Sequence, residues 1–366
     1  MTEVHVIVPE GIDDPERPSG GNLYDRRVCD GLAAIGWAVH EHAVPGDWPW
    51  PGEAEHAALA DAVRRIPDGA VVLLDGLIAS AAPEVLVPHA HRLRQVVLVH
   101  MPLGHRPQGG AVRARERDVL AAAAAVVTTS AWSRRRLEDL YALPADRIEV
   151  AEPGVDAAGL APGTAAGDRL LCVAAVTSGK GHDVLLDGLA TAMDLPWTCA
   201  CVGSLDRAPD FAAAVRRRAR DSGMGDRVRF PGPRTGAELA RAYAAADLLV
   251  LASHAETYGM VVTEALARGL PVLATEVGGV PEALGHGKDR TRPGLLVPPG
   301  DPAAIGAALR RWLADAELRA RLRRAARERR ASLRPWAATT RDVARALTAV
   351  ASSAERGAGI PAGAAR

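Results

Sequence analysis

Two glutamates flank a Tyr-Gly pair in the stretch HAETYGMVVTEALARGLPVLATEVGGVPE, where Glu256 and Glu264 are eight positions apart. The apolar run DLLVLAS (247–253) predicts a buried strand, so Glu256 falls in the loop at its carboxyl end. Glu264 falls about one turn into a helix expected near 260–268. The free N–H groups at the start of such a helix suit a diphosphate, and a carboxylate one turn further on can accept two hydrogen bonds from a ribose diol. The pattern therefore predicts a site for a sugar nucleotide.

The elements that must position this site alternate along the whole chain. Short apolar runs rich in Val and Leu are separated by longer Ala-, Arg- and Leu-rich segments of helical period. Near-continuous apolar strands between helices are typical of parallel sheets that are covered on both faces. The expected strands lie at 4–8, 70–74, 95–99, 124–129, 170–176, 197–202, 227–230, 247–253, 271–275 and 294–297. The expected helices lie near 22–35, 53–66, 111–122, 131–141, 182–193, 209–221, 237–245, 260–268 and 302–331.

These elements predict an α/β protein with two Rossmann-like lobes, each built on a parallel sheet. The first lobe is expected at 1–155, and a small, weakly hydrophobic segment at 156–168 is interpreted as the linker to a second lobe at 169–334. A last helix is expected at 335–354 and a disordered tail at 355–366. Ligands of open parallel sheets bind beyond the carboxyl ends of the strands, so function is expected in a cleft between the two lobes.

The composition narrows the class of protein. The 366 residues carry 44 basic and 44 acidic side chains, and this zero net charge argues against a nucleic-acid partner. The four cysteines, at 29, 172, 199 and 201, lack the spacing of a zinc site and predict buried free thiols in a reducing compartment. No run approaches the roughly 18 consecutive apolar residues of a membrane-spanning helix, and the chain enters its first strand without a leader, so a cytoplasmic protein is expected.

The stretch around the two glutamates continues as ALARGLPVLAT and GGVPE. An E-x7-E pattern after an apolar strand, followed by these two segments, resembles the retaining glycosyltransferases of family 4. The resemblance covers nearly the whole chain and implies a GT-B fold, in which the last helix crosses back to the first lobe. Further pieces agree in order: SGGNLYDRR near the N-terminus, VHMPLGH (99–105), VTTSAWSRRRL (127–137), EPGVD (152–156), KGHDVLLDGLA (180–190) and GLLVPPGD (294–301).

This resemblance implies roles for the matching residues. Lys180 would neutralise the diphosphate, Glu256 would contact the transferred sugar, and His100 would hydrogen-bond the donor sugar near the reacting carbon. Glu264 would hold the ribose of the donor. The other donor contacts would come from a tight loop at Gly20 and Gly21 and from the backbone of Tyr258, Gly259 and Met260.

The activity implied is retaining transfer of a hexosyl group from a nucleoside-diphosphate sugar to a hydroxyl on a small molecule, a glycan or a glycolipid. The negative charge that develops on the departing phosphate would meet Lys180 and the helix start at 259–260, so no metal or other cofactor is expected. No residue is placed as a covalent nucleophile, which favours attack by the acceptor on the face that the diphosphate leaves. A sugar-nucleotide epimerase, a phosphorylase and a non-catalytic sugar-nucleotide-binding protein are alternatives on the same scaffold.

One arginine that is usual in the family is missing from this chain. The family places it five residues before the lysine, where this sequence has Ala175, and Arg234 is a hypothetical substitute. Two residues of the first lobe, Asp75 after a strand and His105 in the loop that follows His100, are candidates for acceptor or cleft contacts.

Residues 106–136 carry seven arginines against two acids, Glu116 and Asp118. Such an excess could meet an anionic acceptor or a lipid surface. A solvated helix face is the favoured interpretation, so membrane association is an alternative that is not favoured.

Overall fold

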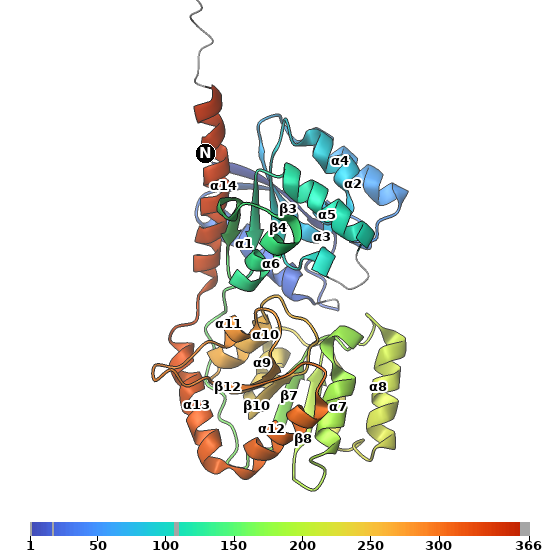
Figure 1. Cartoon of the computed structure of the whole chain (residues 1–366), viewed down its shortest axis with the longest axis vertical. Helices are drawn as coiled ribbons and strands as arrows, with labels where there is room; N and C mark the ends of the chain where they lie inside the picture. The colour runs from blue at the N-terminus through green and yellow to red at the C-terminus, as the bar shows by residue number, and fades with distance from the viewer. Residues whose placement is uncertain (1, 17, 106–109, 359–366) are drawn as a thin grey trace, which may run out of the picture. The chain divides into compact units, whose positions relative to one another are not determined.

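The computed structural model describes residues 2–16, 18–105 and 110–358. The chain folds into two compact units, and each contains a six-stranded parallel sheet with helices packed on it (Figure 1). The expected α/β class and the expected parallel sheets are therefore confirmed in both units. Of the described residues, the first unit contains 2–13, 21–105, 110–153 and 336–358, and the second contains 14–16, 18–20 and 154–335.

The strands of the first unit are β1 (Glu3–Pro9), β2 (Ala38–Val44), β3 (Val71–Asp75), β4 (Arg94–Val99), β5 (Ala125–Thr128) and β6 (Ile148–Val150). They lie in the order β2-β1-β3-β4-β5-β6. Four of them match expected runs, whereas the two edge strands, β2 and β6, match none of the runs expected from the sequence. Strand β2 is AVHEHAV with mostly exposed or half-buried residues, and β6 has only three residues, so neither carries the apolar run of a central strand.

Helices cover both faces of this sheet because alternate strand residues point to opposite sides. Val72 and Leu74 of β3 pack in one apolar cluster with residues of α2, α3, α5 and α6. Leu73 packs in the other cluster, with residues of α1 and α14. The helices are α1 (Gly20–Ala34), α2 (Glu53–Arg65), α3 (Gly76–Ala81), α4 (Pro83–Leu86), α5 (Gly110–Ala122), α6 (Ala131–Tyr141) and α14 (Trp336–Ala358).

The last helix, α14, packs on the first unit, as the sequence predicts. Val343 and Leu347 are fully buried in the cluster that contains α1. Thr340 touches α1 so closely that a Cβ at Gly31 would lie 2.1 Å from its Oγ1. Thr339 Oγ1 donates a hydrogen bond of 2.7 Å to the carbonyl of Glu152, next to the end of the first-unit chain. Residues 359–366, the larger part of the expected tail, lie outside the described residues.

The strands of the second unit are β7 (Arg169–Val173), β8 (Thr198–Val202), β9 (Val228–Gly232), β10 (Leu248–Leu251), β11 (Val272–Thr275) and β12 (Gly294–Val297). They lie in the order β12-β11-β10-β7-β8-β9, and all six match expected apolar runs. The helices are α7 (His182–Ala190), α8 (Pro209–Asp221), α9 (Gly236–Ala244), α10 (Met260–Ala267), α11 (Val280–Leu284), α12 (Pro302–Ala314) and α13 (Ala316–Arg330).

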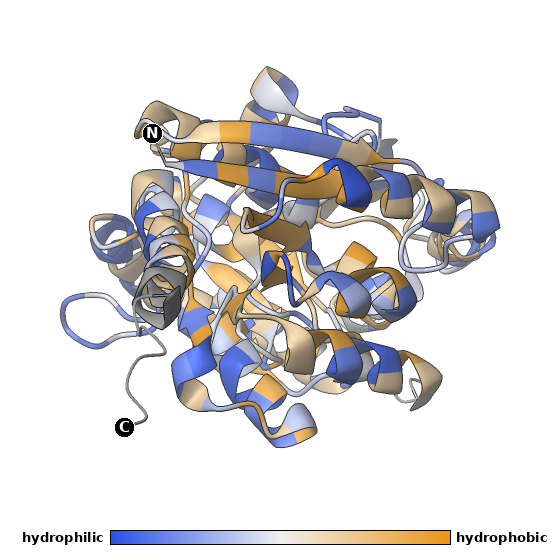
Figure 2. Cartoon of the chain, turned by 90° about the horizontal axis from the view of Figure 1, so that it is seen from above, coloured by the Kyte–Doolittle hydropathy of each residue, from blue (hydrophilic) through white to orange (hydrophobic). Residues whose placement is uncertain are grey.

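The long helix expected at 302–331 is divided in two. Asp315 ends α12 and caps α13, because its side chain accepts a hydrogen bond of 2.9 Å from the N–H of Leu318. Figure 2 shows hydrophilic and hydrophobic residues alternating along the helices, which is typical of helices with one face on a sheet. All four cysteines are free and buried, as expected.

The segment before β7 is tied to the second unit by one buried acid. Asp247, whose side chain is fully buried, accepts hydrogen bonds from the Thr164 hydroxyl at 2.7 Å and from the Arg169 N–H at 3.0 Å. Arg323 of α13 pairs with the same carboxylate at 3.0 Å. A single carboxylate therefore holds the segment, the first strand of this unit and α13 together.

Candidate functional site

Lys180 and Glu256 lie in contact at the carboxyl ends of two neighbouring strands of the second unit. Lys180 ends a short 3-10 helix after β7, and Glu256 is in the loop after β10. Lys180 Nζ donates to Glu256 Oε1 at 2.6 Å, and the same oxygen accepts a hydrogen bond of 2.8 Å from Ser253 Oγ. The chain leaves β7 toward β8 on one side and returns to β10 on the other, so these strands flank the switch point of the sheet. Ligands of such sheets bind at this point.

Two glycines allow the loops of this pair to approach neighbouring backbone. Gly181 has a φ of +64°, and a Cβ there would lie 2.0 Å from the carbonyl oxygen of Ala252. Gly278 has a φ of +53°, and a Cβ there would lie 1.6 Å from the carbonyl oxygen of Glu256. Any larger residue would push either loop away. The Gly-Gly turn of the motif therefore holds the Glu256 loop in place, and Gly279 N–H donates to the Glu256 carbonyl at 3.1 Å.

Helix α10 begins directly after the Glu256 loop. Gly259 is its N-cap, and no side chain caps its first turn. The positive end of the helix dipole and its first N–H groups therefore suit an anion. Tyr258 is buried and Met260 is half-buried at this helix start. All three residues lie where the sequence places them, at the start of the helix.

Glu264 lies on α10 and is held by two residues that sequence reasoning missed. Tyr243 of α9 is fully buried, and its hydroxyl donates a hydrogen bond of 2.7 Å to Glu264 Oε2. The Arg268 guanidinium lies over the Tyr243 ring, 4.4 Å from its centre, and donates to the Glu264 carbonyl at 2.8 Å. Burial raises the pKa of Glu264 above its ordinary value, although the Tyr243 hydroxyl and Arg268 oppose this rise. One carboxylate oxygen, Oε1, carries no hydrogen bond within the described part of the chain.

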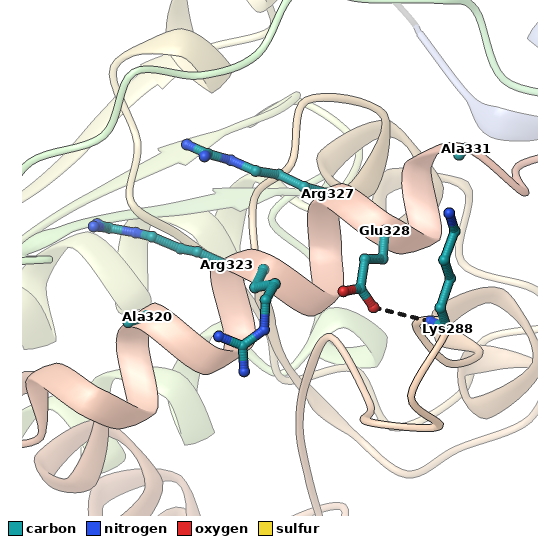
Figure 3. A pocket seen from close by; sticks show the side chains of 7 residues that line it. Lys288, Ala320, Arg323, Arg327, Glu328 and Ala331 are labelled. Atoms are coloured by element: carbon teal, nitrogen blue, oxygen red, sulfur yellow. Dashed lines mark hydrogen bonds between the residues drawn. The ribbon is translucent and has the colours of Figure 1, made fainter.

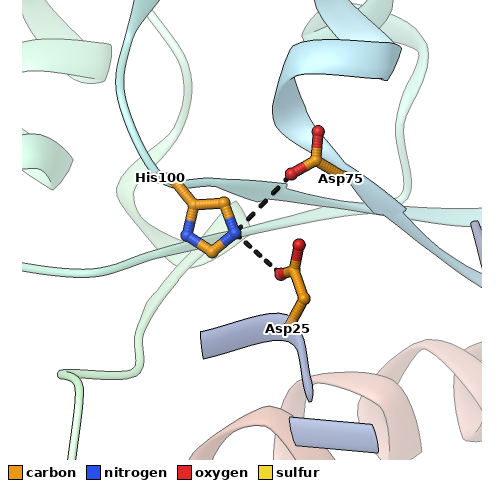
Figure 4. Close-up of side chains that lie close together, drawn as sticks. All are labelled: Asp25, Asp75 and His100. Atoms are coloured by element: carbon orange, nitrogen blue, oxygen red, sulfur yellow. Dashed lines mark hydrogen bonds and ion pairs between the residues drawn. The ribbon is translucent and has the colours of Figure 1, made fainter. Parts of the chain in front are cut away.

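Asp25, Asp75 and His100 converge in the first unit, where β3 and β4 end beside α1 (Figure 4). His100 Nε2 lies 2.7 Å from Asp25 Oδ1 and 3.6 Å from Asp75 Oδ2. The side chains of both aspartates are only 3% exposed, and that of His100 is 14% exposed. Asp75 also caps α3, because its Oδ1 accepts from the N–H groups of Leu77 at 2.8 Å and Ile78 at 3.2 Å.

Within this cluster, the charge of each neighbour shifts the pKa values of Asp75 and His100. Burial, followed by the charge of Asp25, raises the pKa of Asp75 to about 7, whereas His100 opposes the rise. Burial alone would lower the pKa of His100, but the charge and hydrogen bond of Asp25 and the charge of Asp75 raise it above its ordinary value. The ligand atoms of the three residues lie within 4.8 Å of one another, a spacing that a divalent cation could also use.

Of the other candidates from the N-terminal half of the chain, Gly21 contacts His100 and His105 does not. Gly21 lies against the His100 ring, since a Cβ there would be 3.4 Å from His100 Cδ2. Gly20 and Gly21 form the first turn of α1, not the expected loop, because the helix begins earlier than the sequence suggests. His105 instead contacts α6, where Arg136 Nε donates to its Nδ1 at 2.8 Å. His105 therefore lies outside the cluster of His100.

Two family descriptions match the chain. "Glycosyltransferase Family 4" matches residues 2–158, and "Glycosyl transferases group 1" matches residues 166–329. The chain belongs to glycosyltransferase family 4. The resemblance inferred from the E-x7-E stretch is thus confirmed.

Two curated relatives of this chain are D-inositol 3-phosphate glycosyltransferases. The D-inositol 3-phosphate glycosyltransferase of Frankia alni is 34% identical over 277 residues, which are 70% of this chain and 66% of that protein. Its counterpart from Jonesia denitrificans is 32% identical over 281 residues, which are 70% of this chain and 64% of that protein. The chain therefore spans slightly less than two thirds of the length of these relatives.

Solved structures of other proteins share the fold of this chain. Sucrose-phosphate synthase from Thermosynechococcus elongatus gives a TM-score of 0.79 at 22% identity, covering 96% of this chain and 100% of that one. Anabaena HepE in complex with UDP-glucose gives a TM-score of 0.75 at 18% identity, covering 95% of this chain and 100% of that one. The expected GT-B fold with two Rossmann-like lobes is confirmed by this likeness.

One buried acid of this family 4 chain was misjudged from the sequence. Glu116 of α5 is fully buried, so this residue does not belong to the solvated helix face that is expected for residues 106–136. Its Oε1 accepts hydrogen bonds from the Leu103 N–H at 2.9 Å and the Ser80 hydroxyl at 3.1 Å. Its Oε2 accepts from the Gly104 N–H at 2.9 Å and from the Tyr141 hydroxyl. The carboxylate therefore fastens the loop that follows β4.

Replacing Glu116 by alanine is expected to lower the free energy of unfolding by about 3 kcal/mol, because four donors, three of them buried, lose their acceptor. Glu116→Gln should lower it less, since one acceptor oxygen is kept. Urea unfolding followed by circular dichroism measures both variants. Asp118→Ala, two positions further along the same helix and exposed, is the control and should stay within about 0.5 kcal/mol. An unchanged unfolding midpoint in Glu116→Ala would contradict the role given to this carboxylate.

The missing arginine has no evident substitute at Arg234. This side chain is 40% exposed and lies 3.5 Å from the Glu238 carboxylate, one turn into the neighbouring helix α9. Ala175 itself is half-buried after β7, and a Cβ at Gly203 would lie 2.9 Å from its backbone nitrogen. Lys180 is therefore the cation that the described structure places at the end of β7.

Several arginines of the 106–136 stretch are paired within the first unit. Arg115 lies 2.8 Å from Glu84, and Arg134 lies 3.1 Å from Glu138. Arg106 lies outside the described residues. These pairs support the interpretation of a solvated helix face, and among the described residues no helix is long and apolar enough to cross a bilayer.

A hollow of about 680 Å³ lies along α13, and its lining includes none of the site residues that the sequence predicts (Figure 3). Glu328, which lines it, accepts a hydrogen bond of 2.9 Å from the Lys288 N–H. Arg323 also lines it, although its guanidinium is already paired with Asp247. The full lining is Lys288, Ala320, Arg323, Arg324, Arg327, Glu328 and Ala331.

Proposed function

We propose that this chain is a retaining glycosyltransferase that moves a hexosyl group from a nucleoside-diphosphate sugar to a hydroxyl acceptor. The observation that carries the proposal is the Lys180–Glu256 pair at the switch point of the second sheet, next to the uncapped start of α10. A departing diphosphate needs fixed positive charge where its own negative charge develops. The ammonium group and the helix start supply such charge from the same edge of the sheet.

The contact with Glu256 fixes the position of the Lys180 ammonium group and leaves N–H donors for the diphosphate. Its ammonium group has three N–H donors and gives one to Glu256, so the other donors can reach phosphate oxygens. Because Glu256 is only 12% exposed and also accepts from Ser253, it holds the ammonium in one place before the donor arrives. We propose that the free face of the Glu256 carboxylate contacts a hydroxyl of the transferred sugar.

The remaining roles follow the family likeness. Glu264 would accept hydrogen bonds from the ribose through Oε1, since Oε2 is engaged by Tyr243. Backbone N–H groups at Gly20, Gly21, Tyr258, Gly259 and Met260 would contact the donor, and His100 would hydrogen-bond its sugar. The acceptor hydroxyl would attack the anomeric carbon on the face that the diphosphate leaves. As the bond from carbon to diphosphate oxygen breaks, the proton of the hydroxyl would pass to the departing phosphate.

The donor and acceptor classes are proposed from the relatives. HepE was solved in complex with UDP-glucose, so a UDP-hexose is the first donor to test. The curated relatives are named for D-inositol 3-phosphate, so a phosphorylated polyol is the first acceptor to test. Because Lys180 and α10 supply the positive charge, we expect transfer to continue in the presence of EDTA.

A panel of UDP-, GDP- and dTDP-hexoses in a thermal-shift experiment tests donor binding. A donor at 100 times its Kd should stabilise the protein by about 2.7 kcal/mol and raise Tm accordingly. Transfer is then measured with the stabilising donor and D-inositol 3-phosphate, by mass and anomeric configuration of the product. Epimerised donor without an acceptor, or sugar phosphate formed only with inorganic phosphate, would assign the chain to an epimerase or a phosphorylase instead.

A further inference from the structure

The His100 ring is held by two carboxylates that come from different elements of the first unit. Asp25 approaches from α1 and Asp75 from the end of β3, and both face the same ring nitrogen, Nε2 (Figure 4). The Tyr24 ring packs edge-on against the imidazole, with ring centres 5.2 Å apart. The charges of both aspartates act on the His100 imidazole.

The hydrogen bond with Asp25 decides what the other ring nitrogen can do. A neutral imidazole carries one proton, and a 2.7 Å contact with a carboxylate places that proton on Nε2. Nδ1, which points away from both carboxylates in Figure 4, would then be a hydrogen-bond acceptor. Only a second proton turns Nδ1 into a donor.

The cluster favours that second proton. Asp25 Oδ1 and Asp75 Oδ2 lie within 3.6 Å of Nε2, and a negative charge on either carboxyl group favours the imidazolium over the neutral ring. Asp75 holds its position independently of the ring, because its Oδ1 is fixed by the first N–H groups of α3. Its Oδ2 is therefore kept facing His100 whether or not a ligand is present.

We propose that Asp25 and Asp75 are positioning residues that keep His100 doubly protonated, so that Nδ1–H is offered as a hydrogen-bond donor to an oxygen of the substrate. The part that concerns the substrate rests on the proposed function, and the protonation of the ring does not. Neither aspartate touches the reacting atoms in this proposal. Both act through the charge and the orientation of the imidazole.

The protonation is tested on the ligand-free protein by NMR of histidines labelled with carbon-13 at Cε1, with His100→Gln used to assign the signal. In the wild type, His100 should titrate above the ordinary histidine value of about 6.5. Asp25→Asn should lower that midpoint by at least about 1 pH unit, because a neighbouring opposite charge shifts a pKa by roughly 1 to 3. Asp30→Asn, exposed on the same helix, is the control and should leave the midpoint unchanged. A wild-type His100 midpoint at or below that ordinary value would overturn the proposal.

The pH dependence of the thermal stability provides a second test, through Asp75. Burial raises the pKa of its carboxyl to about 7, so its stabilising contribution is complete below the ordinary aspartate value and is lost as pH rises through about 7. Asp75→Asn removes this loss, while the amide oxygen can still cap α3. The Tm of Asp75→Asn minus that of the wild type should therefore grow from pH 6 to pH 8. A constant difference would show that Asp75 is not part of the shared titration.

The pH dependence of kcat and the effect of divalent cations on Tm distinguish the positioning role from a structural role and from a metal site. In Asp25→Asn, the pH above which kcat falls should move down together with the His100 midpoint, which a merely structural role would not produce. If the NMR midpoints move as expected but the wild type transfers no sugar, the proposed function fails and the positioning role stands. A rise in the Tm of the wild type on addition of Mg²⁺ or Mn²⁺, absent in Asp25→Asn, would show that the cluster holds a metal and would overturn the proposal.

Discussion

Replacing Lys180 by alanine is expected to lower kcat for sugar transfer by about 100- to 1,000-fold, the usual loss when one fixed donor to a developing negative charge is removed. The ammonium lies 2.6 Å from Glu256 and is held before any ligand binds, so its effect should appear in the chemical step more than in donor affinity. Release of the nucleoside diphosphate at saturating donor measures kcat. Titration of Tm against donor measures affinity in the same samples.

The chain offers a matched control for this substitution. Lys288 is the only other lysine in the sequence, and it is exposed in the loop before β12. Lys288→Ala should keep wild-type kcat. Lys180→Arg should recover only part of the lost rate, since a planar guanidinium cannot replace an ammonium that donates to Glu256 and to phosphate from one point. Wild-type turnover in Lys180→Ala would remove the lysine from the site.

The second-unit site could be predicted because its residues follow strands that are easily recognised. DLLVLAS and LLCVAAV are continuous apolar runs, and the structure makes them the adjacent central strands β10 and β7. The carboxyl ends of adjacent parallel strands lie at one edge of the sheet, so Lys180 and Glu256 had to be neighbours once the strands were paired. The GGVPE motif predicted the position of the Glu256 loop, because the carbonyl of Glu256 lies so close to Gly278 that only glycine fits there.

The residues that orient the site could not be found in this way. Tyr243 meets Glu264 across two helices, and which side of α9 faces α10 depends on packing that no local pattern records. Asp25 lies 75 positions before His100, on a helix whose starting point the sequence placed two residues too late. Glu116 stands among arginines, so its charge pattern is typical of an exposed face although its carboxylate binds two backbone N–H groups.

The edge strands of the first sheet could not be predicted from the sequence for a related reason. Strand β2 carries His40, Glu41 and His42, and its register pairs His5 with His40 at the margin of the first sheet. A strand with one open edge needs no apolar run, so periodicity cannot mark it. The same limit applies to the donor base and the acceptor, because their selection depends on loop geometry and not on the strands that carry the loops.

Replacing Glu264 by alanine is expected to weaken donor binding by about 1.5 to 3 kcal/mol, or roughly 10- to 150-fold in Kd, the usual loss for hydrogen bonds to a charged group. Calorimetric titration with the stabilising nucleotide sugar measures the change. Tyr243→Phe keeps the carboxylate but removes the hydroxyl that fixes Oε2, so its effect should be smaller, about 0.5 to 1.5 kcal/mol. Glu317→Ala, exposed at the start of α13, should bind donor as the wild type does.

The pH dependence of donor binding distinguishes a ribose contact from a purely structural role for Glu264. The ionised carboxylate is the acceptor for a diol, and burial raises the pKa of Glu264 above its ordinary value. Affinity should therefore be full at neutral pH and should fall on acidification at a higher pH than a glutamate in water would give. In Glu264→Gln this fall should disappear, because the amide does not titrate in that range. If the wild type and Glu264→Gln lose affinity in parallel as pH falls, the ribose is held by another group and Glu264 serves only to pair with the buried Tyr243 hydroxyl.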